Sequence, residues 1–476
     1  MIFNSFQFLW LFPLIFGGYY TISYLLKKKE QGKESNILLL LISYALYMQY
    51  APWYTLVLLW VTLITYFMAI CITVSYKKKK TICWLGTILG STPLVIFKYY
   101  NFIINNINEV LNHGNLSGLN WAIPIGISFF SFQAIGYLVD VYKQRVSMER
   151  NFIDYALFVS FFPQIMSGPI SRASDLLPQI KNKRTFSGAK AVQGLKWLLW
   201  GMFLKTVMAD RLGLYVDSVY NNFQYQSGFS CLVASFMYTM QIYGDFAGYS
   251  LMAIGVGRLL GFDLVNNFNH PYFATSITEF WKRWHISLTR WLTTYIYIGL
   301  GGNRCSKIRQ YWNIMVTFLV SGVWHGANWT FIFWGFIHGM LQCIEKILGI
   351  DPKGKYSNHP LFRKLIPIRI LITFLLVNFA WILFRLPSLE VANIVFSKIF
   401  TWEGSGLFLP SNSTLAFMLI ALTIVISKDI CEEYFSKIQL FNNQNVVVRW
   451  SSYLIIITLI MLCGVFDSSQ FIYVKF

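Results

Sequence analysis

Long apolar runs separated by short basic segments dominate the chain. Such runs cover residues 3–26, 36–50, 54–76, 81–100, 121–142, 229–261, 370–386, 415–427 and 452–466. A helix needs about 20 predominantly apolar residues to cross the hydrocarbon core of a bilayer, and several of these runs reach that length. The pattern therefore predicts an all-α, polytopic integral membrane protein with roughly ten to twelve transmembrane helices.

Two stretches depart from a simple crossing. Residues 152–170 contain two prolines and lie between basic segments, which favours a re-entrant element over a full crossing. Residues 189–220 predict one or two helices. The run at 229–261 contains Asp245, and a carboxylate inside an apolar helix needs either a partner or a water-filled cavity. We expect one of the two beside Asp245.

Charged residues are few, and their positions indicate the orientation of the chain. They make up 12% of the 476 residues, whereas a soluble domain carries about a quarter. The net charge of +19 comes from Lys and Arg in short loops between apolar runs, so membrane lipids and no nucleic acid are the expected surroundings. The lysine clusters at 27–29 and 77–80 then lie in the cytoplasm, and both termini lie outside.

Three of the six histidines, His285, His325 and His338, lie in residues 280–339 among tryptophans and glycines. An ionisable side chain in an apolar region is costly and by default indicates function. The chain has no GxSxG, Walker or HExxH motif and no CxxC pair, which disfavours a serine hydrolase, an ATPase and a metal site. Histidine is then the candidate acid or base, and acyl transfer to a hydroxyl is the simplest chemistry that fits.

The first of these histidines belongs to a predicted amphipathic helix. At helical spacing Trp281, Trp284 and His285 share one face, while Arg283 and Arg290 lie on the other. This arrangement is typical of a helix at the membrane interface with His285 turned inward. The alternative is an ordinary hydrogen-bonded interfacial histidine beside anchoring aromatic residues.

The other two histidines each precede the second glycine of a GxxxG pair, a spacing that lets another helix or a ligand approach the backbone closely. His338 is interpreted as a packing residue. Around His325 the small residues remove bulk while Trp324 and Trp329 form walls, and Asn328 follows closely. That combination predicts room for a substrate beside a base, since a neutral imidazole can take a proton from a hydroxyl.

The motifs at residues 267–292, 295–304 and 321–335 resemble the membrane-bound O-acyltransferase family, in its bacterial branch of alginate and peptidoglycan O-acetyltransferase membrane subunits. The resemblance implies one domain over 1–476, with a ring of helices around a central tunnel and a catalytic core at 280–339. It also implies that His325 is the catalytic histidine and His285 the second signature histidine. The side chains expected to line the substrate path are Trp281, Arg283, Trp284, Trp324, Asn328 and Asp245.

The same resemblance implies the reaction. Acetyl groups would pass from a cytoplasmic thioester, acetyl-CoA, across the inner membrane to an envelope polysaccharide, with peptidoglycan favoured over alginate and a periplasmic O-acetyltransferase as partner. The tail at 467–476 contains FIYVKF, which resembles a terminal motif of this branch and makes Tyr473 a candidate acyl relay. A hydrophobic tail that docks on a partner is the alternative for this segment.

Two other classes of function remain open on the sequence. A transporter or channel would use the intramembrane histidines and Asp245 as a proton or substrate path. Its expected signature, an internal repeat with matching broken helices, is not evident in the sequence. A non-enzymatic scaffold for envelope enzymes would leave His325 replaceable.

Overall fold

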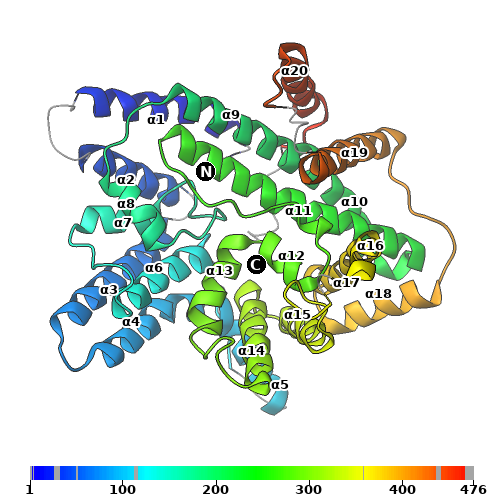
Figure 1. Cartoon of the computed structure of the whole chain (residues 1–476), viewed down its shortest axis with the longest axis horizontal. Helices are drawn as coiled ribbons and strands as arrows, with labels where there is room; N and C mark the ends of the chain where they lie inside the picture. Colours follow the sequence, from blue (N-terminus) through cyan, green and yellow to red (C-terminus); the bar gives the residue numbers. More distant parts are fainter. Residues whose placement is uncertain are drawn as a thin grey trace. The chain divides into compact units, whose positions relative to one another are not determined.

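The computed structural model describes residues 3, 5–25, 33–49, 52–111, 116–356, 359–435 and 441–466. The regular structure in this part of the chain is entirely helical (Figure 1), which confirms the predicted fold class. The tail at 467–476, with the predicted relay Tyr473, lies outside the described residues. The chain forms two compact units, and α9 (Gly188–Met202) and α11 (Gly228–Leu259) contribute residues to both.

The first unit consists of Met1–Leu198 and Met252–Val265. Besides parts of α9 and α11, its helices are α1 (Phe6–Leu25), α2 (Lys33–Met48), α3 (Thr55–Val74), α4 (Lys79–Leu94), α5 (Tyr100–Leu111), α6 (Ile127–Tyr142), α7 (Phe152–Ser160) and α8 (Ala173–Lys181). A π-helical segment, Val95–Tyr99, joins α4 to α5. Helix α7 ends before Pro163, as expected of an element broken by proline, and its predicted re-entrant path stays a prediction.

The second unit consists of Leu199–Leu251 and the residues from Asn266 onward. Besides the remaining parts of α9 and α11, its helices are α10 (Asp210–Tyr220), α12 (Ile277–Arg283), α13 (Ile286–Leu292), α14 (Lys307–His325), α15 (Trp329–Leu348), α16 (Pro360–Lys364), α17 (Ile366–Arg385), α18 (Leu389–Thr401), α19 (Asn412–Tyr434) and α20 (Val446–Cys463). The candidate site residues with described side chains all belong to this unit.

Within the described residues, seven helical segments are long and apolar enough to cross a membrane. They are Gln7–Leu25, Pro52–Val74, Lys79–Leu111, Trp329–Leu348, Ile366–Arg385, Asn412–Tyr434 and Val446–Cys463. The chain is therefore a multi-pass membrane protein. The larger number of roughly ten to twelve crossings, with its re-entrant and interfacial helices, stays a prediction.

A buried ion triad holds α11 in the second unit. Lys205 lies on a π-helical segment, Phe203–Ala209, and its Nζ is 2.6 Å from Asp210 Oδ1 and 2.5 Å from Asp245 Oδ1. All three side chains are at most 1% exposed, so each charge depends on its partners for compensation. The prediction that Asp245 needs a partner is confirmed, and the partner is Lys205.

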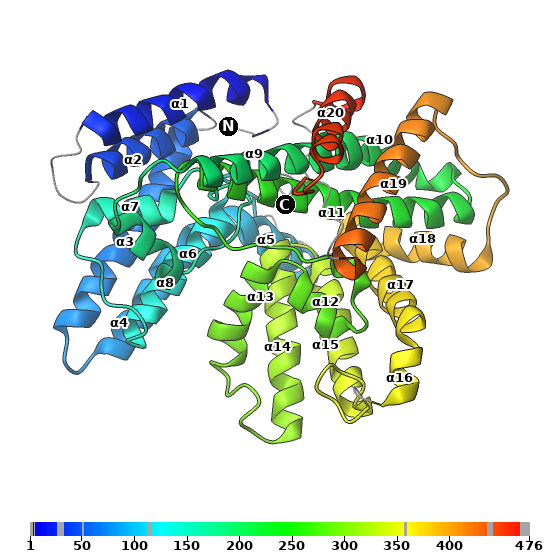
Figure 2. The same ribbon diagram turned by 45° about the horizontal axis from the view of Figure 1, so that its top comes forward.

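Helices α14 and α15 lie side by side along a glycine seam (Figures 1 and 2). A Cβ added at Gly322 would overlap the carbonyl oxygen of Phe331, and one added at Gly335 would overlap that of Phe318. The close approach predicted from the GxxxG spacing is thus confirmed. This seam places the end of α14, which carries His325, against the first turns of α15.

Candidate functional site

His285 lies in a break between α12 and α13, so the single amphipathic helix predicted through this stretch is wrong. His285 has a φ of 43°, in the left-handed region that non-glycine residues seldom adopt. Two donors at the start of α13, the backbone N–H groups of Ile286 and Ser287, bond at 3.0 Å to the backbone oxygen and Oδ1 of Asn267. Because a distant loop satisfies these groups, α13 begins anew instead of continuing α12.

The inward orientation predicted for His285 is confirmed. Its side chain is fully buried, and its ring centroid lies 4.5 Å from that of Phe246 and 5.9 Å from that of Trp324. Burial lowers the pKa of His285 to about 3, which keeps the imidazole neutral near pH 7. Lys282 on α12 and Arg290 on α13 are both exposed.

His325 is the last residue of α14 and sits in an aromatic enclosure. Its ring centroid lies 4.9 Å from Trp324, 5.1 Å from Trp334 and 5.1 Å from Phe384, and 4% of the residue is exposed. Trp324 is the wall that the sequence predicted. Trp329 does not form a wall, because it is 53% exposed. Trp334, five residues further along α15, takes its place.

The two signature histidines are brought together by a shared neighbour. The ring of Trp324 lies against both His285 and His325, although the two histidines are 40 positions apart in the sequence. The ring of Phe331 fills the space beside Gly326, since a Cβ at that position would overlap this ring. The glycines thus serve to pack α14 against α15.

His338 has the packing role that the sequence indicated. Its Nδ1 accepts a hydrogen bond from the indole N–H of Trp281 at 3.3 Å, and its ring centroid lies 4.9 Å from that of Trp334. Since Trp334 also contacts His325, this ring separates the two histidines on α14 and α15. His338 therefore packs against Trp334 on the side away from His325.

Specific contacts hold the other predicted lining residues. Trp281 and Trp284 are buried among aromatic rings, and Trp284 lies 5.1 Å from Trp381 between ring centroids. Arg283 pairs with Glu279 at 2.7 Å. The Asn328 side chain caps α15 by accepting the backbone N–H of Thr330, and it donates to the Pro387 carbonyl at 2.7 Å. A substrate path along these residues, and along Asp245, stays a prediction.

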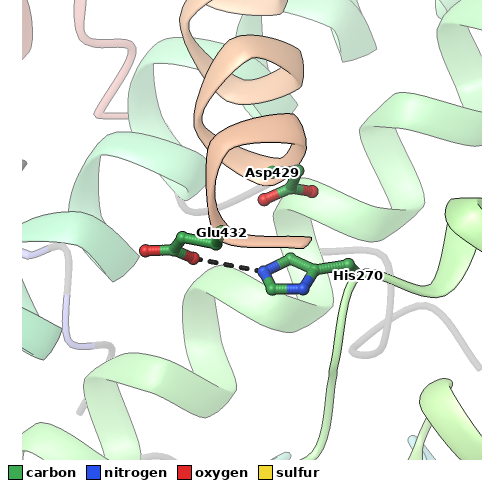
Figure 3. A group of neighbouring side chains, drawn as sticks. All are labelled: His270, Asp429 and Glu432. Atoms are coloured by element: carbon green, nitrogen blue, oxygen red, sulfur yellow. Dashed lines mark hydrogen bonds and ion pairs between the residues drawn. The ribbon is translucent and has the colours of Figure 1, made fainter. Parts of the chain in front are cut away.

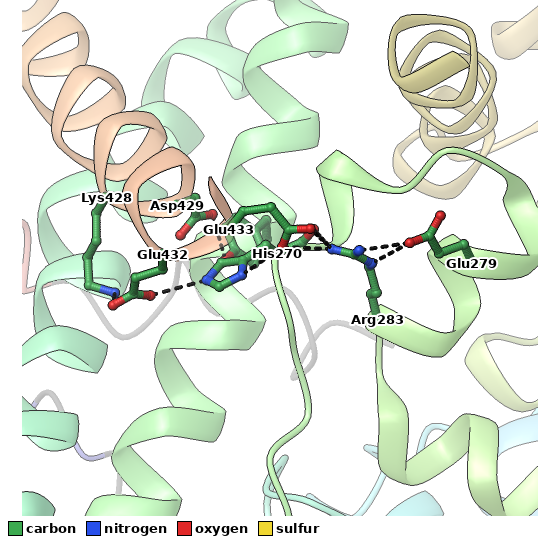
Figure 4. A network of polar contacts seen from close by, with 8 residues as sticks. His270, Glu279, Arg283, Lys428, Asp429, Glu432 and Glu433 are labelled. Atoms are coloured by element: carbon green, nitrogen blue, oxygen red, sulfur yellow. Dashed lines mark hydrogen bonds and ion pairs between the residues drawn. The ribbon is translucent and has the colours of Figure 1, made fainter. Parts of the chain in front are cut away.

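A polar cluster at the C-terminal end of α19 was not predicted from the sequence. His270 Nε2 lies 3.1 Å from Glu432 Oε2. A carboxylate oxygen of Asp429 lies within 4.8 Å of both atoms (Figure 3). Glu433 lies between His270 Nδ1, at 3.3 Å, and the Arg283 guanidinium, at 2.9 Å (Figure 4). The spacing of three acids within five residues on one helix was a detectable signal, but nothing in the sequence placed His270 beside them.

A second residue missed from the sequence is Glu345 on α15. Its carboxylate accepts the backbone N–H groups of Ile277 and of Thr278, the latter at 2.9 Å, and so caps the start of α12. An acidic group at a helix N-terminus satisfies free N–H groups and favours the helix dipole. Glu345 thereby ties α12 to α15.

The chain matches the model of the membrane-bound O-acyltransferase family (MBOAT) over residues 2–349. It is 38% identical over 416 residues to the probable alginate O-acetylase AlgI of Pseudomonas aeruginosa, covering 86% of this chain and 77% of that protein. It is 34% identical over 448 residues to the peptidoglycan O-acetyltransferase of Helicobacter pylori, covering 88% and 83%. It is 28% identical over 280 residues to the teichoic acid D-alanyltransferase of Streptococcus thermophilus, covering 56% and 64%.

Proposed function

The chain belongs to the membrane-bound O-acyltransferase family, and we propose that this membrane O-acyltransferase moves acetyl groups from cytoplasmic acetyl-CoA across the inner membrane for O-acetylation of an envelope polysaccharide. The names of the relatives support acetyl as the transferred group and a polysaccharide as the final acceptor. The observation that carries the proposal is the enclosure of His325 by Trp324, Trp334 and Phe384, within a core that also contains His285.

His325 is the proposed general base. It takes the proton of the acceptor hydroxyl, whose oxygen attacks the thioester carbonyl, and a new C–O ester bond replaces the C–S bond. The proton then passes from His325 to the departing CoA thiolate, so the base returns to its neutral form. The apolar enclosure keeps water away from the reacting thioester and so limits its hydrolysis.

His285 is proposed to position the donor side of the reaction. It is neutral and buried, and the two short helices that flank it, α12 and α13, carry the exposed cations Lys282 and Arg290. These cations are suited to the phosphates of CoA, because ammonium and guanidinium groups bind phosphate through charge-assisted hydrogen bonds. We place both termini on the periplasmic side and these exposed cations at the cytoplasmic face, in keeping with the positive-inside rule.

Tyr473 is the proposed relay on the far side of the membrane. Its phenol hydroxyl would accept the acetyl group as an ester, and a periplasmic polysaccharide O-acetyltransferase would pass the group on to the polymer. This step stands on the resemblance of FIYVKF to the terminal motif of the family branch.

The experiment that tests the function measures ester-linked acetate in the envelope of a deletion strain. Mild base releases the acetate, which is quantified separately in purified peptidoglycan and in exopolysaccharide. Peptidoglycan is the acceptor that we propose first, and alginate is the other acceptor that the relatives name.

The strain is complemented with wild type, with His325→Ala, or with His359→Ala, a control at an exposed histidine. We expect wild type and His359→Ala to restore the acetate and His325→Ala to leave it absent, at equal amounts of membrane-inserted protein. Unchanged acetate in both polymers of the deletion strain would refute the proposed function.

A further inference from the structure

The polar cluster at the end of α19 has the composition and geometry of a cation site. His270, Asp429 and Glu432 each offer one ligand atom, and these atoms lie within 4.8 Å of one another (Figure 3). In a tetrahedral zinc site with bonds of about 2.0–2.2 Å, neighbouring ligand atoms stand roughly 3.4 Å apart. The 3.1 Å between His270 Nε2 and Glu432 Oε2 is close to that spacing, and the remaining ligand distances, up to 4.8 Å, have to shorten by side-chain rotation when an ion binds.

The charges around the cluster leave room for a cation. Glu432 uses Oε1 for Lys428, at 2.6 Å, and keeps Oε2 for the side of His270. Asp429 is 8% exposed, and its Oδ2 accepts a hydrogen bond from the neutral Tyr243 hydroxyl at 3.0 Å. The nearest ammonium group, that of Lys428, is paired with Glu432, and within the described residues Asp429 itself forms no direct ion pair with Lys or Arg.

Neighbouring groups orient the ligands as they do in metal sites. Glu433 Oε2 lies 3.3 Å from His270 Nδ1, which favours a proton on Nδ1 and leaves Nε2 free to bind a metal (Figure 4). The Tyr243 hydroxyl holds Asp429 through Oδ2 in the same way. A carboxylate behind the histidine and a donor behind the acid are the usual outer partners of metal ligands.

We propose that His270, Asp429 and Glu432 bind one divalent transition-metal ion of the Zn²⁺ class. The imidazole ligand selects this class over Ca²⁺ and Mg²⁺, which prefer sites made of oxygen ligands alone. The histidine and Glu432 side chains are 17% and 36% exposed, so an ion reaches the site from outside the protein. The inference does not depend on acetyl transfer, and either one can fail alone.

The metal links the C-terminal end of α19, through Asp429 and Glu432, to the segment 267–270, through His270. The backbone N–H of Asn269, next to His270, bonds to the Arg283 carbonyl at 2.9 Å. Two residues earlier, Asn267 accepts the first N–H groups of α13. The ion therefore stabilises the segment from 267 to 270 and, through it, the backbone around His285.

The test is a Co²⁺ titration of purified full-length protein that carries no polyhistidine tag and has been stripped with a chelator. Wild type is expected to bind one equivalent, with visible absorption bands typical of four- or five-coordinate Co²⁺, and Zn²⁺ is expected to displace it. Tyr243→Phe is expected to weaken Co²⁺ binding roughly 10–100-fold, because it removes only an outer partner of Asp429. Asp429→Asn and His270→Gln are expected to abolish the bands, and His359→Ala serves as the matched control that keeps them.

The thermal unfolding midpoint of each metal-free variant is measured first, and Glu432→Gln provides a further conservative change if another variant fails to fold. Bands that persist in folded Asp429→Asn would place the ion elsewhere and overturn the proposal. Absence of saturable Co²⁺ binding in wild type would show that the cluster is only a group of ion pairs and would overturn the proposal. Competition by Ca²⁺ or Mg²⁺ at the same concentration as Zn²⁺ would also contradict the proposed metal class.

Discussion

The contact between α14 and α15 can be tested by adding one methyl group at Gly322. A Cβ there would overlap the Phe331 carbonyl oxygen and lie 3.1 Å from the Phe331 carbonyl carbon and 3.3 Å from Ile332 Cα. All three atoms belong to the backbone, so no side-chain rotation relieves the overlap and α15 has to move away. Overpacking of this kind costs about 1–3 kcal/mol, and the better helix propensity of alanine returns at most about 1 kcal/mol.

The displacement also affects the proposed active site. Helix α15 carries Trp334, which contacts His325 at the end of α14. A misplacement of about 1 Å near reacting groups can cost on the order of 100-fold in rate. We therefore expect Gly322→Ala to unfold at a lower temperature than wild type and to transfer acetyl groups at least tenfold more slowly.

The matched control is Gly17→Ala, where an added Cβ meets no atom within 4 Å. It should keep the wild-type rate and the same or a slightly higher unfolding midpoint. The assay combines thermal unfolding in detergent, followed by tryptophan fluorescence, with transfer of labelled acetyl. Wild-type stability and rate in Gly322→Ala would refute the tight seam between α14 and α15.

Further predictions concern buried polar groups. Lys205→Met leaves two buried carboxylates without their shared cation, so we expect a loss of about 3–5 kcal/mol in the free energy of unfolding. Lys190→Met, which breaks an ion pair with two half-exposed partners, should cost about 0–1 kcal/mol by the same denaturation assay. Burial lowers the pKa of His285, so only the unfolded state takes up its proton between about pH 6.5 and 3. Stability should therefore be complete above pH 6.5 and fall by about 2 kcal/mol on going to pH 5, and His285→Gln should lose this part of the slope. Asn267→Ala removes the Oδ1 that accepts the N–H of Ser287, with an expected cost of about 1–3 kcal/mol and a slower acetyl transfer.

The sequence predicted those features that depend on nearby residues. The apolar run at 3–26 became α1, the run at 370–386 became most of α17, and glycines four apart became the seam of α14 and α15. Each follows from length, hydropathy or spacing within one or two helices. The need of Asp245 for a partner was also predictable, because burial of an unpaired carboxylate is costly wherever the partner lies.

Features that depend on distant residues could not be predicted. The break at His285 arises because Asn267, 18 positions earlier, satisfies the N–H groups that start α13. The cluster around His270 depends on α19, whose Glu432 lies 162 positions later. Helical periodicity carries no information about either contact, so the amphipathic pattern predicted one helix where the chain forms two. The roles of His325 and His285 as base and positioning residue stay predictions.

The most direct test of the central claim follows labelled acetyl from acetyl-CoA in a single turnover of purified protein. Wild type and His325→Gln are compared at saturating donor, after their unfolding midpoints have been shown to agree closely enough for both to be folded. If His325 is the general base, the variant should release CoA about 10²–10⁴-fold more slowly than wild type. Release of CoA and transfer of label at the wild-type rate in folded His325→Gln would contradict the account.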